Sequence, residues 1–491
     1  MELSQTSITH FDKRLSRIST CTESADSIVP DSYPDIGRIV CAYGMAAVKD
    51  QTPQSGRLLV SGIVQTIVLY EPENGGALRR LTVPVSFAHI EECDGLDAEA
   101  ICIVNCQAAS IEATPVNSRK VNVSVQLCFE TEGYCQTTCQ VTEQIDLPQV
   151  ELLRTSRNVT LIEEVRRCPI TILDDATLPD AAGLYLLHSF CTLKISECRA
   201  MNGKVALKGE AVIQCLGLQE DDAVRALSSS APFTQILEMP KVSEGDTVSA
   251  RLVVNELDCR LELDGLLSYT VSAAALVTMR RTRVLQQIDD LYLPGRTLEL
   301  QEERVTLHSM PPLTPFGTEI SETLQTVQHV SHIVSAFAAC CGAKCSAEGE
   351  LQMNVAVQIL YLNDEQQLSA LQRVLPLTAP CASFGELSQL ELAARATSAG
   401  ERGVLLTIAV SGMTAAEERC VFRQIISAEA GEEKKQTDGV TLALRYIDEA
   451  QSLWEIAKVC GTTMDAIRQA NELSADTISV TDTMLLIPIQ A

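Results

Sequence analysis

Two histidines and three cysteines in the third quarter of the chain are the residues whose types could best hold a metal ion. They are His329, His332, Cys340, Cys341 and Cys345. Imidazole nitrogens and thiolates are the usual ligands of zinc. Their spacing matches no standard zinc motif, however, and a small buried apolar turn would explain the same residues. We therefore predict no metal site, and the pair Cys135 and Cys139 is a weaker candidate still.

The sequence carries no motif that would support catalysis. It lacks the phosphate-binding loop, the dinucleotide fingerprint, the Gly-x-Ser-x-Gly elbow and the His-Glu-x-x-His motif. The 64 acidic residues make any one pair of carboxylates uninformative as an acid and base. We predict a chain that is not an enzyme and needs no cofactor.

Charge and composition exclude several classes of partner. The chain has 491 residues, with 38 basic and 64 acidic residues for a net charge of −26. This balance argues against binding to nucleic acid or to an anionic membrane, since both require basic surfaces. The N-terminus does not resemble a signal peptide, and the longest apolar run is too short to span a bilayer. In a reducing cytoplasm most of the 19 cysteines are expected to be small buried hydrophobic residues.

A long internal repeat organises the chain. Residues 55–91 align without a gap to residues 202–238, which pairs Gly62 with Gly209. Each copy alternates apolar and polar residues, turns through a polar segment and continues in a second apolar run, a pattern typical of a β-hairpin. The glycine in the middle of each first strand predicts a bulge or the close approach of another backbone.

The repeat extends beyond the hairpin and returns a third time. Near the same offset, Pro148 matches Pro294 and residues 159–161 match residues 305–307, while Tyr361 answers Tyr70. A period this long indicates tandem domains and not a solenoid. We predict a mainly β protein with three tandem β-rich domains followed by a small α+β (βααβ) module.

The predicted boundaries follow from these patterns and from the intervening segments. They are an N-terminal arm at 1–27 with a short helix near 11–18, a first domain with its connector at 28–174, a second at 175–315, a divergent third at 316–426, a charged linker at 427–440 and the module at 441–491. The third domain is expected to begin with a helix over 321–337, because Leu324, Val327, Val330, Val334 and Phe337 have helical spacing.

The C-terminal module combines strand, helix, helix and strand signals in about fifty residues. Ser452 with Glu455, and Thr462 with Asp465, are expected to cap the two helices. The order and the residues resemble the LysM family, small βααβ domains best known for binding glycans that contain N-acetylglucosamine. The resemblance rests on Tyr446, Leu453, Trp454, Ile456, Ala457, Ile467, Asn471, Leu485, Ile487 and Pro488.

The LysM resemblance implies a binding face for a partner or a glycan. We expect it to include Ala450, Gln451, Ser452, Leu453, Trp454, Ile467 and Asn471. At the turn beside the usual glycan groove, Ala450, Gln451 and Ser452 replace the family's Gly-Asp-Thr. Trp454, the only tryptophan, either packs against the second helix or the linker, or is exposed as an interface anchor.

The β domains resemble the SPOCS domain, also catalogued as domain of unknown function 3794. The similarity lies in VPDSYPDIGRIV at residues 29–40, in the strand that ends at Leu69 and Tyr70, and in the turn to Pro84. Tandem copies ahead of a LysM module are similar to SipL-type spore morphogenesis proteins. That resemblance implies a scaffold in the mother-cell cytoplasm, at the forespore surface and spore coat, that partners the coat ATPase stage IV sporulation protein A through the LysM module. The alternative is a protein of the spore or cell wall that binds peptidoglycan glycan strands.

Overall fold

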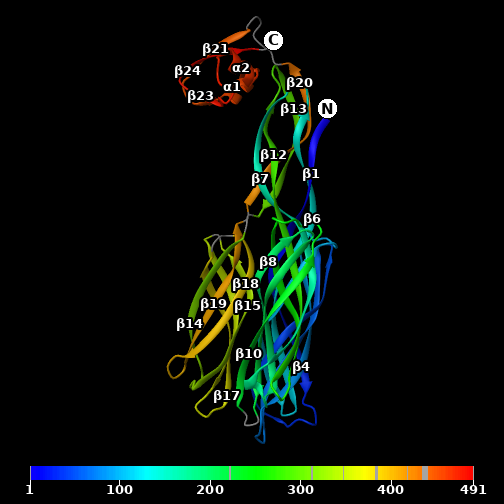
Figure 1. The fold of residues 1–491 in the computed structure, drawn as a ribbon, viewed down its shortest axis with the longest axis vertical. Coiled ribbons are helices and arrows are strands. Elements are labelled where there is room, and N and C mark those ends of the chain that lie inside the picture. Colours follow the sequence, from blue (N-terminus) through cyan, green and yellow to red (C-terminus); the bar gives the residue numbers. More distant parts are fainter. Residues whose placement is uncertain are drawn as a thin grey trace.

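Three β-sandwich units lie side by side at one end of an elongated molecule, and a stalk of paired strands leads from them to the C-terminal module (Figure 1). The computed structural model describes residues 2–219, 223–310, 313–346, 348–381, 385–416, 418–433 and 441–489. Strands account for most of these residues, as the alternating apolar pattern predicts. The mainly β fold with a small helix-containing module is thereby confirmed.

Unit one is made of residues 2–146. It contains β1 (Glu2–Ile28), β2 (Ile36–Gln54), β3 (Arg57–Pro72), β4 (Arg79–Glu92), β5 (Ile101–Asn117) and β6 (Lys120–Asp146). Its two antiparallel sheets have the strand orders β2-β3-β4 and β1-β6-β5. Strand β4 shows why they pack together: Leu81, Val83, Val85 and Phe87 are buried while the residues between them are exposed.

Unit two, residues 151–292, repeats this arrangement. It contains β7 (Glu151–Thr177), the 3-10 turn η1 (Pro179–Ala181), β8 (Tyr185–Met201), β9 (Lys204–Leu218), β10 (Val224–Glu238), β11 (Thr247–Leu261) and β12 (Leu266–Tyr292). The sheets have the orders β10-β9-β8 and β11-β12-β7. The hairpins predicted from the repeat are β3–β4 and β9–β10.

Unit three, residues 296–433, has the same plan with two of its long strands interrupted. It contains β13 (Arg296–Ser309), β14 (Thr314–Gln325), β15 (His332–Cys345), β16 (Glu350–Leu362), β17 (Leu368–Pro380), β18 (Gly385–Ser398), β19 (Gly403–Ala416) and β20 (Glu418–Glu433). The sheets are β15-β16-β17 and β14-β19-β18, and β13 pairs with β20.

The paired glycines of the repeat have matching surroundings. A Cβ on Gly62 would lie 2.2 Å from the carbonyl oxygen of Ala47 and 2.5 Å from Cζ of Phe87. At Gly209 the corresponding distances are 2.1 Å to the carbonyl oxygen of Lys194 and 2.5 Å to Cζ of Phe233. A register shift lies opposite each glycine, so both the close approach and the bulge that the sequence predicts are present.

The stalk is formed by the outer parts of β1, β6, β7 and β12 together with β13 and β20 (Figure 1). It consists of three two-stranded ribbons, β1–β6, β7–β12 and β13–β20, one from each unit. Two buried clusters hold the ribbons together. They comprise Ile8, Val141, Val159, Leu161, Leu285, Leu307, Cys420 and Phe422, and nearer the tip Ile145, Ile288, Leu291, Ile425 and Ala428.

An aromatic cluster joins the three units to one another. Tyr43 on β2, Phe190 on β8 and Phe337 on β15 follow one another at intervals of 147 positions. The ring of Phe190 lies 4.3 Å from that of Phe337 and 5.9 Å from that of Tyr43, measured between centroids. Equivalent positions of the repeat therefore meet at one point, and the single chain builds a pseudo-threefold assembly.

A buried ion cluster lies at a second junction of the units. Nη2 of Arg280 on β12 is 2.8 Å from Oε2 of Glu386 on β18, with side-chain exposures of 1% and 8%. Lys13 on β1 contacts both Glu386, at 3.5 Å, and Glu132, at 3.3 Å. Arg251 adds a 2.6 Å contact to Glu132, so acidic and basic groups from all three units neutralise one another.

Three predicted features near the ends of the chain are wrong. The arm at 1–27, with its helix near 11–18, is the long strand β1, which pairs with β6 along its whole length. The linker at 427–440 is strand β20 as far as Glu433, and its remainder lies outside the described residues. These conformations are determined by pairing with strands that are distant in sequence, and this pairing cannot be predicted from local composition.

The helix predicted over 321–337 is also wrong. Residues up to Gln325 belong to β14, residues from His332 belong to β15, and Val327 between them is 90% exposed. The segments predicted as connectors at the ends of the first and second domains belong to the units that follow them. Strand β7 pairs with β12 of unit two, and β13 pairs with β20 of unit three. Each unit therefore starts at a stalk ribbon.

Candidate functional site

The C-terminal module has the predicted strand, helix, helix, strand order. It contains β21 (Leu442–Ile447), β22 (Gln451–Ser452), α1 (Leu453–Cys460), α2 (Met464–Ala470), β23 (Ser479–Val480) and β24 (Thr483–Pro488). Ser452 caps α1, because its side chain accepts a 3.2 Å hydrogen bond from the backbone N–H of Trp454. The cap of α2 is Thr463 and not Thr462 as predicted, since α2 begins one residue later than expected.

Three of the predicted binding-face residues serve the module's own structure. Leu453 and Ile467 are fully buried in its core with Ile456, Leu485 and Ile487. The side chain of Asn471 donates to the carbonyl oxygen of Leu486 at 2.6 Å and accepts from its N–H at 2.7 Å. It fastens the end of α2 to β24, so all three residues stabilise the fold, and the fully buried Leu453 and Ile467 present no surface to a ligand.

The turn at 450–452 is joined to the loop before β24. Gln451 and Ser452 form a short strand pair with Val480 and Ser479, and the N–H of Leu453 donates to the carbonyl oxygen of Ile478 at 2.9 Å. Of the three turn residues, Ala450 is exposed, whereas Gln451 and Ser452 are half-buried.

Trp454 docks the module onto the stalk. Its side chain is 5% exposed, and its ring meets that of Tyr292, at the end of β12, edge to face at 4.8 Å. The indole Nε1 donates to Oδ2 of Asp290 at 2.7 Å, and Nζ of Lys458 lies 2.8 and 2.7 Å from the two oxygens of the same carboxylate. Of the two sequence interpretations, exposure is wrong. Trp454 is buried in a cluster that includes Ile467 of α2, and its further partners Tyr292 and Asp290 on the ribbon of unit two were not predicted.

Electrostatics favour this docked position. Burial raises the pKa of Asp290, but hydrogen bonds from Lys458 and Trp454 outweigh it, so the pKa lies below its ordinary value. The hydroxyl of Tyr292 donates to the backbone carbonyl oxygen of Thr462 at 2.8 Å. The module is therefore fixed to the stalk by an aromatic contact, an ion pair and two hydrogen bonds.

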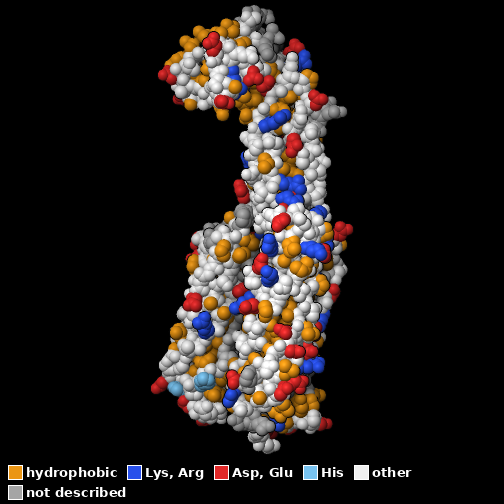
Figure 2. All heavy atoms as spheres, in the orientation of Figure 1, with side chains coloured by type: hydrophobic (Ala, Val, Ile, Leu, Met, Phe, Trp, Pro, Cys, Tyr) orange, Lys and Arg blue, Asp and Glu red, His pale blue; other side chains and the backbone are white. Residues whose placement is uncertain are grey.

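An exposed apolar surface covers the opposite side of the module's sheet. We call it the outer sheet face and define it as Leu442, Leu444, Tyr446 and Met484, which are 50%, 65%, 54% and 54% exposed. Tyr446 lies opposite Met484 in the β21–β24 pair. Hydrophobic side chains are visible on the outer part of the module in Figure 2. The alternation of Leu442, Leu444 and Tyr446 is a sequence signal that could have identified this face.

The histidines and cysteines considered for zinc do not form a site. His329 precedes β15 and lies 2.5 Å from a carboxylate oxygen of Asp364, whereas Cys340, Cys341 and Cys345 are spread along the extended strand. Within the described ranges, no group of three or more His, Cys, Asp or Glu side chains is arranged to hold a metal ion. Extension at about 3.3 Å per residue separates groups that a helix would have brought together.

Comparison with known families gives two matches. The family model described as "SipL, SPOCS domain" matches residues 185–262, which span β8 to β11 of unit two, and the LysM domain model matches residues 449–488. No curated protein and no solved structure matches the chain. Among the described residues, no helix is long and apolar enough to cross a membrane.

Both matched domains are non-catalytic binding domains, and together they identify a sporulation-related protein with a module of the peptidoglycan-binding type. Units one and three share the arrangement of sheets found in unit two, which carries the family match. The chain is thus a SipL-like protein, with a SPOCS domain at residues 185–262 and a C-terminal LysM domain at residues 449–488.

Proposed function

We propose that this chain is a non-enzymatic adaptor in the assembly of the bacterial endospore coat. In this proposal it works in the mother-cell cytoplasm at the forespore surface, where its LysM module attaches stage IV sporulation protein A. The observation that carries the proposal is the outer sheet face of the module, an exposed apolar surface at the far end of a stalk.

The composition of the outer sheet face favours a protein partner. The solvent-facing side of an antiparallel sheet normally carries polar residues. Here that side carries Leu442, Leu444, Tyr446 and Met484. Contiguous apolar patches on a protein surface mark interaction sites, and Tyr and Met are enriched in interface cores. A partner that covers these side chains would remove their apolar area from water.

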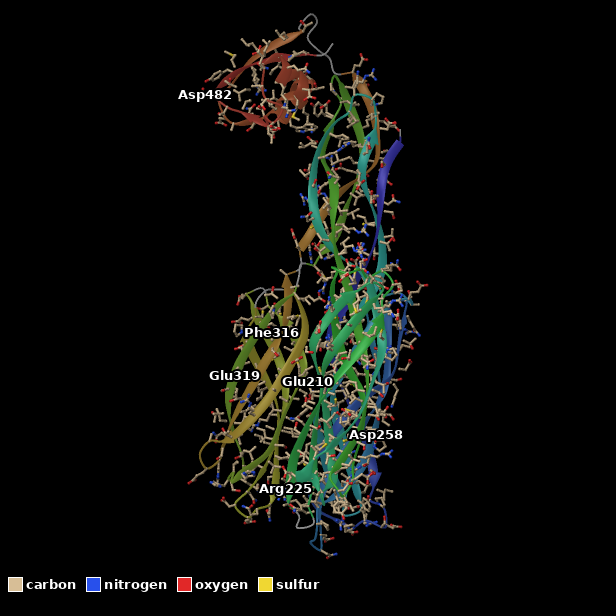
Figure 3. All side chains as sticks on the ribbon, in the orientation of Figure 1. Glu210, Arg225, Asp258, Phe316, Glu319 and Asp482 are labelled. Atoms are coloured by element: carbon tan, nitrogen blue, oxygen red, sulfur yellow. The ribbon has the colours of Figure 1, made fainter. Side chains whose placement is uncertain are left out.

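The docked position of the module supports the same function. Trp454 and Lys458 hold the module on the ribbon of unit two, which leaves β21 and β24 facing outward. Figure 3 labels Asp482, just before β24, on the side of the module away from the stalk. A pre-oriented surface loses less rotational freedom on binding than one on a loose tether.

Binding to peptidoglycan glycan strands is the second candidate function, and the LysM family match favours it. The turn at 450–452 and the loop that ends in β23 are adjacent and would supply the sugar contacts. This surface differs from the outer sheet face, so one set of variants can separate the two functions.

The test uses the full chain and two matched variants, Leu444→Glu and Val459→Glu. Leu444 lies on the outer sheet face, whereas Val459 is a 76% exposed residue of α1 in the same module. Leu444→Glu should weaken capture of purified stage IV sporulation protein A at least about ten-fold, as is common for a central interface residue. Val459→Glu should bind like the original chain.

Cosedimentation with purified peptidoglycan provides the second measurement. Retention of the chain by the cell wall, together with equal capture of the ATPase by both variants, would replace the adaptor function with glycan binding. Capture that survives removal of residues 441–491 would instead locate the contact in the SPOCS units.

A further inference from the structure

Two cysteine thiols face each other between the sheets of unit two. Sγ of Cys215 on β9 lies 3.9 Å from Sγ of Cys259 on β11. These strands belong to different sheets of the sandwich, and the two residues are 44 positions apart. Rotation of the side chains would have to shorten the distance by about 2 Å to reach the 2.05 Å of a disulfide bond.

The two thiols differ in acidity. Hydrogen bonding from Cys215, with a further hydrogen bond from Ser189, lowers the pKa of Cys259 below its ordinary value, although burial opposes the shift. The same contact with Cys259, together with burial, raises the pKa of Cys215. Because the thiolate is the reactive form of cysteine, Cys259 is the better nucleophile of the pair.

Cys259 is also the accessible member of the pair. It is partly exposed and lines a cavity of about 230 Å³ between units one and two, whose wall also includes Lys49, Arg80 and Ser189. Cys215 lies behind it and is 2% exposed. In Figure 3 the neighbouring residue Asp258 marks this part of β11. A small oxidant can therefore reach Cys259 before it reaches Cys215.

We propose that Cys259 and Cys215 form a peroxide-sensitive modification site that closes a disulfide between the two sheets of unit two. The Cys259 thiolate attacks one oxygen of hydrogen peroxide and breaks the O–O bond, which yields a sulfenic acid and hydroxide. The Cys215 thiol then attacks this sulfur and displaces water as the S–S bond forms. In total, two thiols are oxidised by two electrons and one peroxide is reduced to two waters.

A second cysteine contact in the molecule provides an internal comparison. Sγ of Cys128 donates to the backbone carbonyl oxygen of Cys341 at 2.6 Å across the interface between units one and three. Both residues are buried, with exposures of 2% and 5%. If contact between cysteines were sufficient, this pair would oxidise as readily as Cys215 and Cys259. Because an oxidant reaches Cys259 through the cavity, we expect the pair Cys215 and Cys259 to oxidise faster than the buried pair Cys128 and Cys341.

The test treats the reduced full chain with one equivalent of hydrogen peroxide, alkylates the remaining thiols and maps the peptides by mass spectrometry. We expect a Cys215–Cys259 disulfide, two hydrogens lighter than the reduced peptides, as the main product. Cys191→Ser removes a nearby thiol whose own pKa is raised by burial and by the Cys259 charge, and it should leave the product unchanged. Cys215→Ser should instead leave a sulfenic acid on Cys259 that dimedone traps.

Two results would overturn the proposal. One is a Cys259 that oxidises no faster than Cys341 in the original chain, and the other is a disulfide from Cys259 to Cys191 or to any other cysteine. If Cys215→Ser fails to fold, the rates of iodoacetamide labelling in the original chain decide the matter. Cys259 must then react faster than both Cys215 and Cys341. The oxidised chain should also melt at a higher temperature than the reduced chain, and dithiothreitol should reverse this difference.

Discussion

Nε1 of Trp454 donates a 2.7 Å hydrogen bond to Oδ2 of Asp290, a residue 164 positions earlier in the chain. The bond joins α1 of the LysM module to β12 of unit two, and Lys458 shares the same carboxylate. The module is therefore docked at the stalk tip in a defined orientation.

Removing the carboxylate should release the module from the stalk. In Asp290→Ala the indole and the Lys458 ammonium lose a charged acceptor, at a cost of about 1.5–3 kcal/mol for a hydrogen bond to a charged group. Because Trp454 is the only tryptophan, its fluorescence reports the change directly, and we expect a red shift as the ring becomes solvated.

The matched control for this variant is Asp289→Ala. Asp289 precedes Asp290 and accepts a 2.7 Å hydrogen bond from the hydroxyl of Thr155 on the neighbouring strand. Its removal should leave the emission of Trp454 unchanged. An unchanged spectrum in Asp290→Ala as well would mean that the contact with Asp290 does not hold the module in place.

Stability should fall in mild acid because of His188, which packs between the rings of Tyr43 and Phe190. Burial, with a smaller effect of the Arg80 charge, lowers the pKa of His188 to about 3. Below about pH 6.5 the unfolded chain takes up a proton on this residue while the folded chain does not. This residue alone should therefore reduce the free energy of unfolding by about 1 kcal/mol between pH 6.5 and 5.5.

Denaturant titrations of His188→Gln and His332→Gln at the two pH values check this contribution. Between pH 6.5 and 5.5 the free energy of unfolding of His188→Gln should fall by about 1 kcal/mol less than that of the original chain. His332 is exposed, so His332→Gln should follow the original chain. Parallel losses in all three proteins would assign the acid sensitivity to other groups.

The matched glycines of the repeat should not tolerate a side chain. Gly62→Ala would place Cβ 2.2 Å from the carbonyl oxygen of Ala47, and Gly209→Ala would place it 2.1 Å from that of Lys194. Overpacking of this kind typically costs about 1–3 kcal/mol, and each variant should lose that much in thermal unfolding. At Gly317 on β14 the nearest atom to an added methyl group would be 3.9 Å away, so Gly317→Ala should change stability by no more than about 0.5 kcal/mol.

The ion pair between units two and three should be sensitive to the loss of one partner. Glu386→Gln leaves the 1% exposed guanidinium of Arg280 without its carboxylate, and such an unpaired buried charge costs about 3–5 kcal/mol. Glu256→Gln removes an ion pair with Lys49 whose side chains are more than half exposed, and it should cost less than about 1 kcal/mol. Equal midpoints in urea for both variants would contradict a structural role for Glu386.

Some features of the functional site could be read from the sequence, and others could not. The βααβ order and the Ser452 cap follow from local patterns and are correct. The assignment of Leu453 and Ile467 to a binding face is wrong because both are buried, and family positions do not separate residues that build a fold from residues that bind. The docking of Trp454 could not be predicted, since its partner Asp290 lies in another domain.

The sequence by itself determined the class of the fold, the repeat and the family of the C-terminal module. These features depend on alternation, on turn residues and on spacing within short windows, all of which are local. Gly62 and Gly209 belong to this group, because a glycine in a strand already indicates a close approach.

Tertiary structure alone decided how these pieces are joined. Residues 2–28 became a strand because β6 offers them a continuous partner, although their own composition predicts a loose arm. Tyr43, Phe190 and Phe337 meet because three equivalent units pack around one point. Contacts between distant segments form only when the whole chain has folded. A short stretch of sequence therefore does not predict which strands, rings and charges will meet.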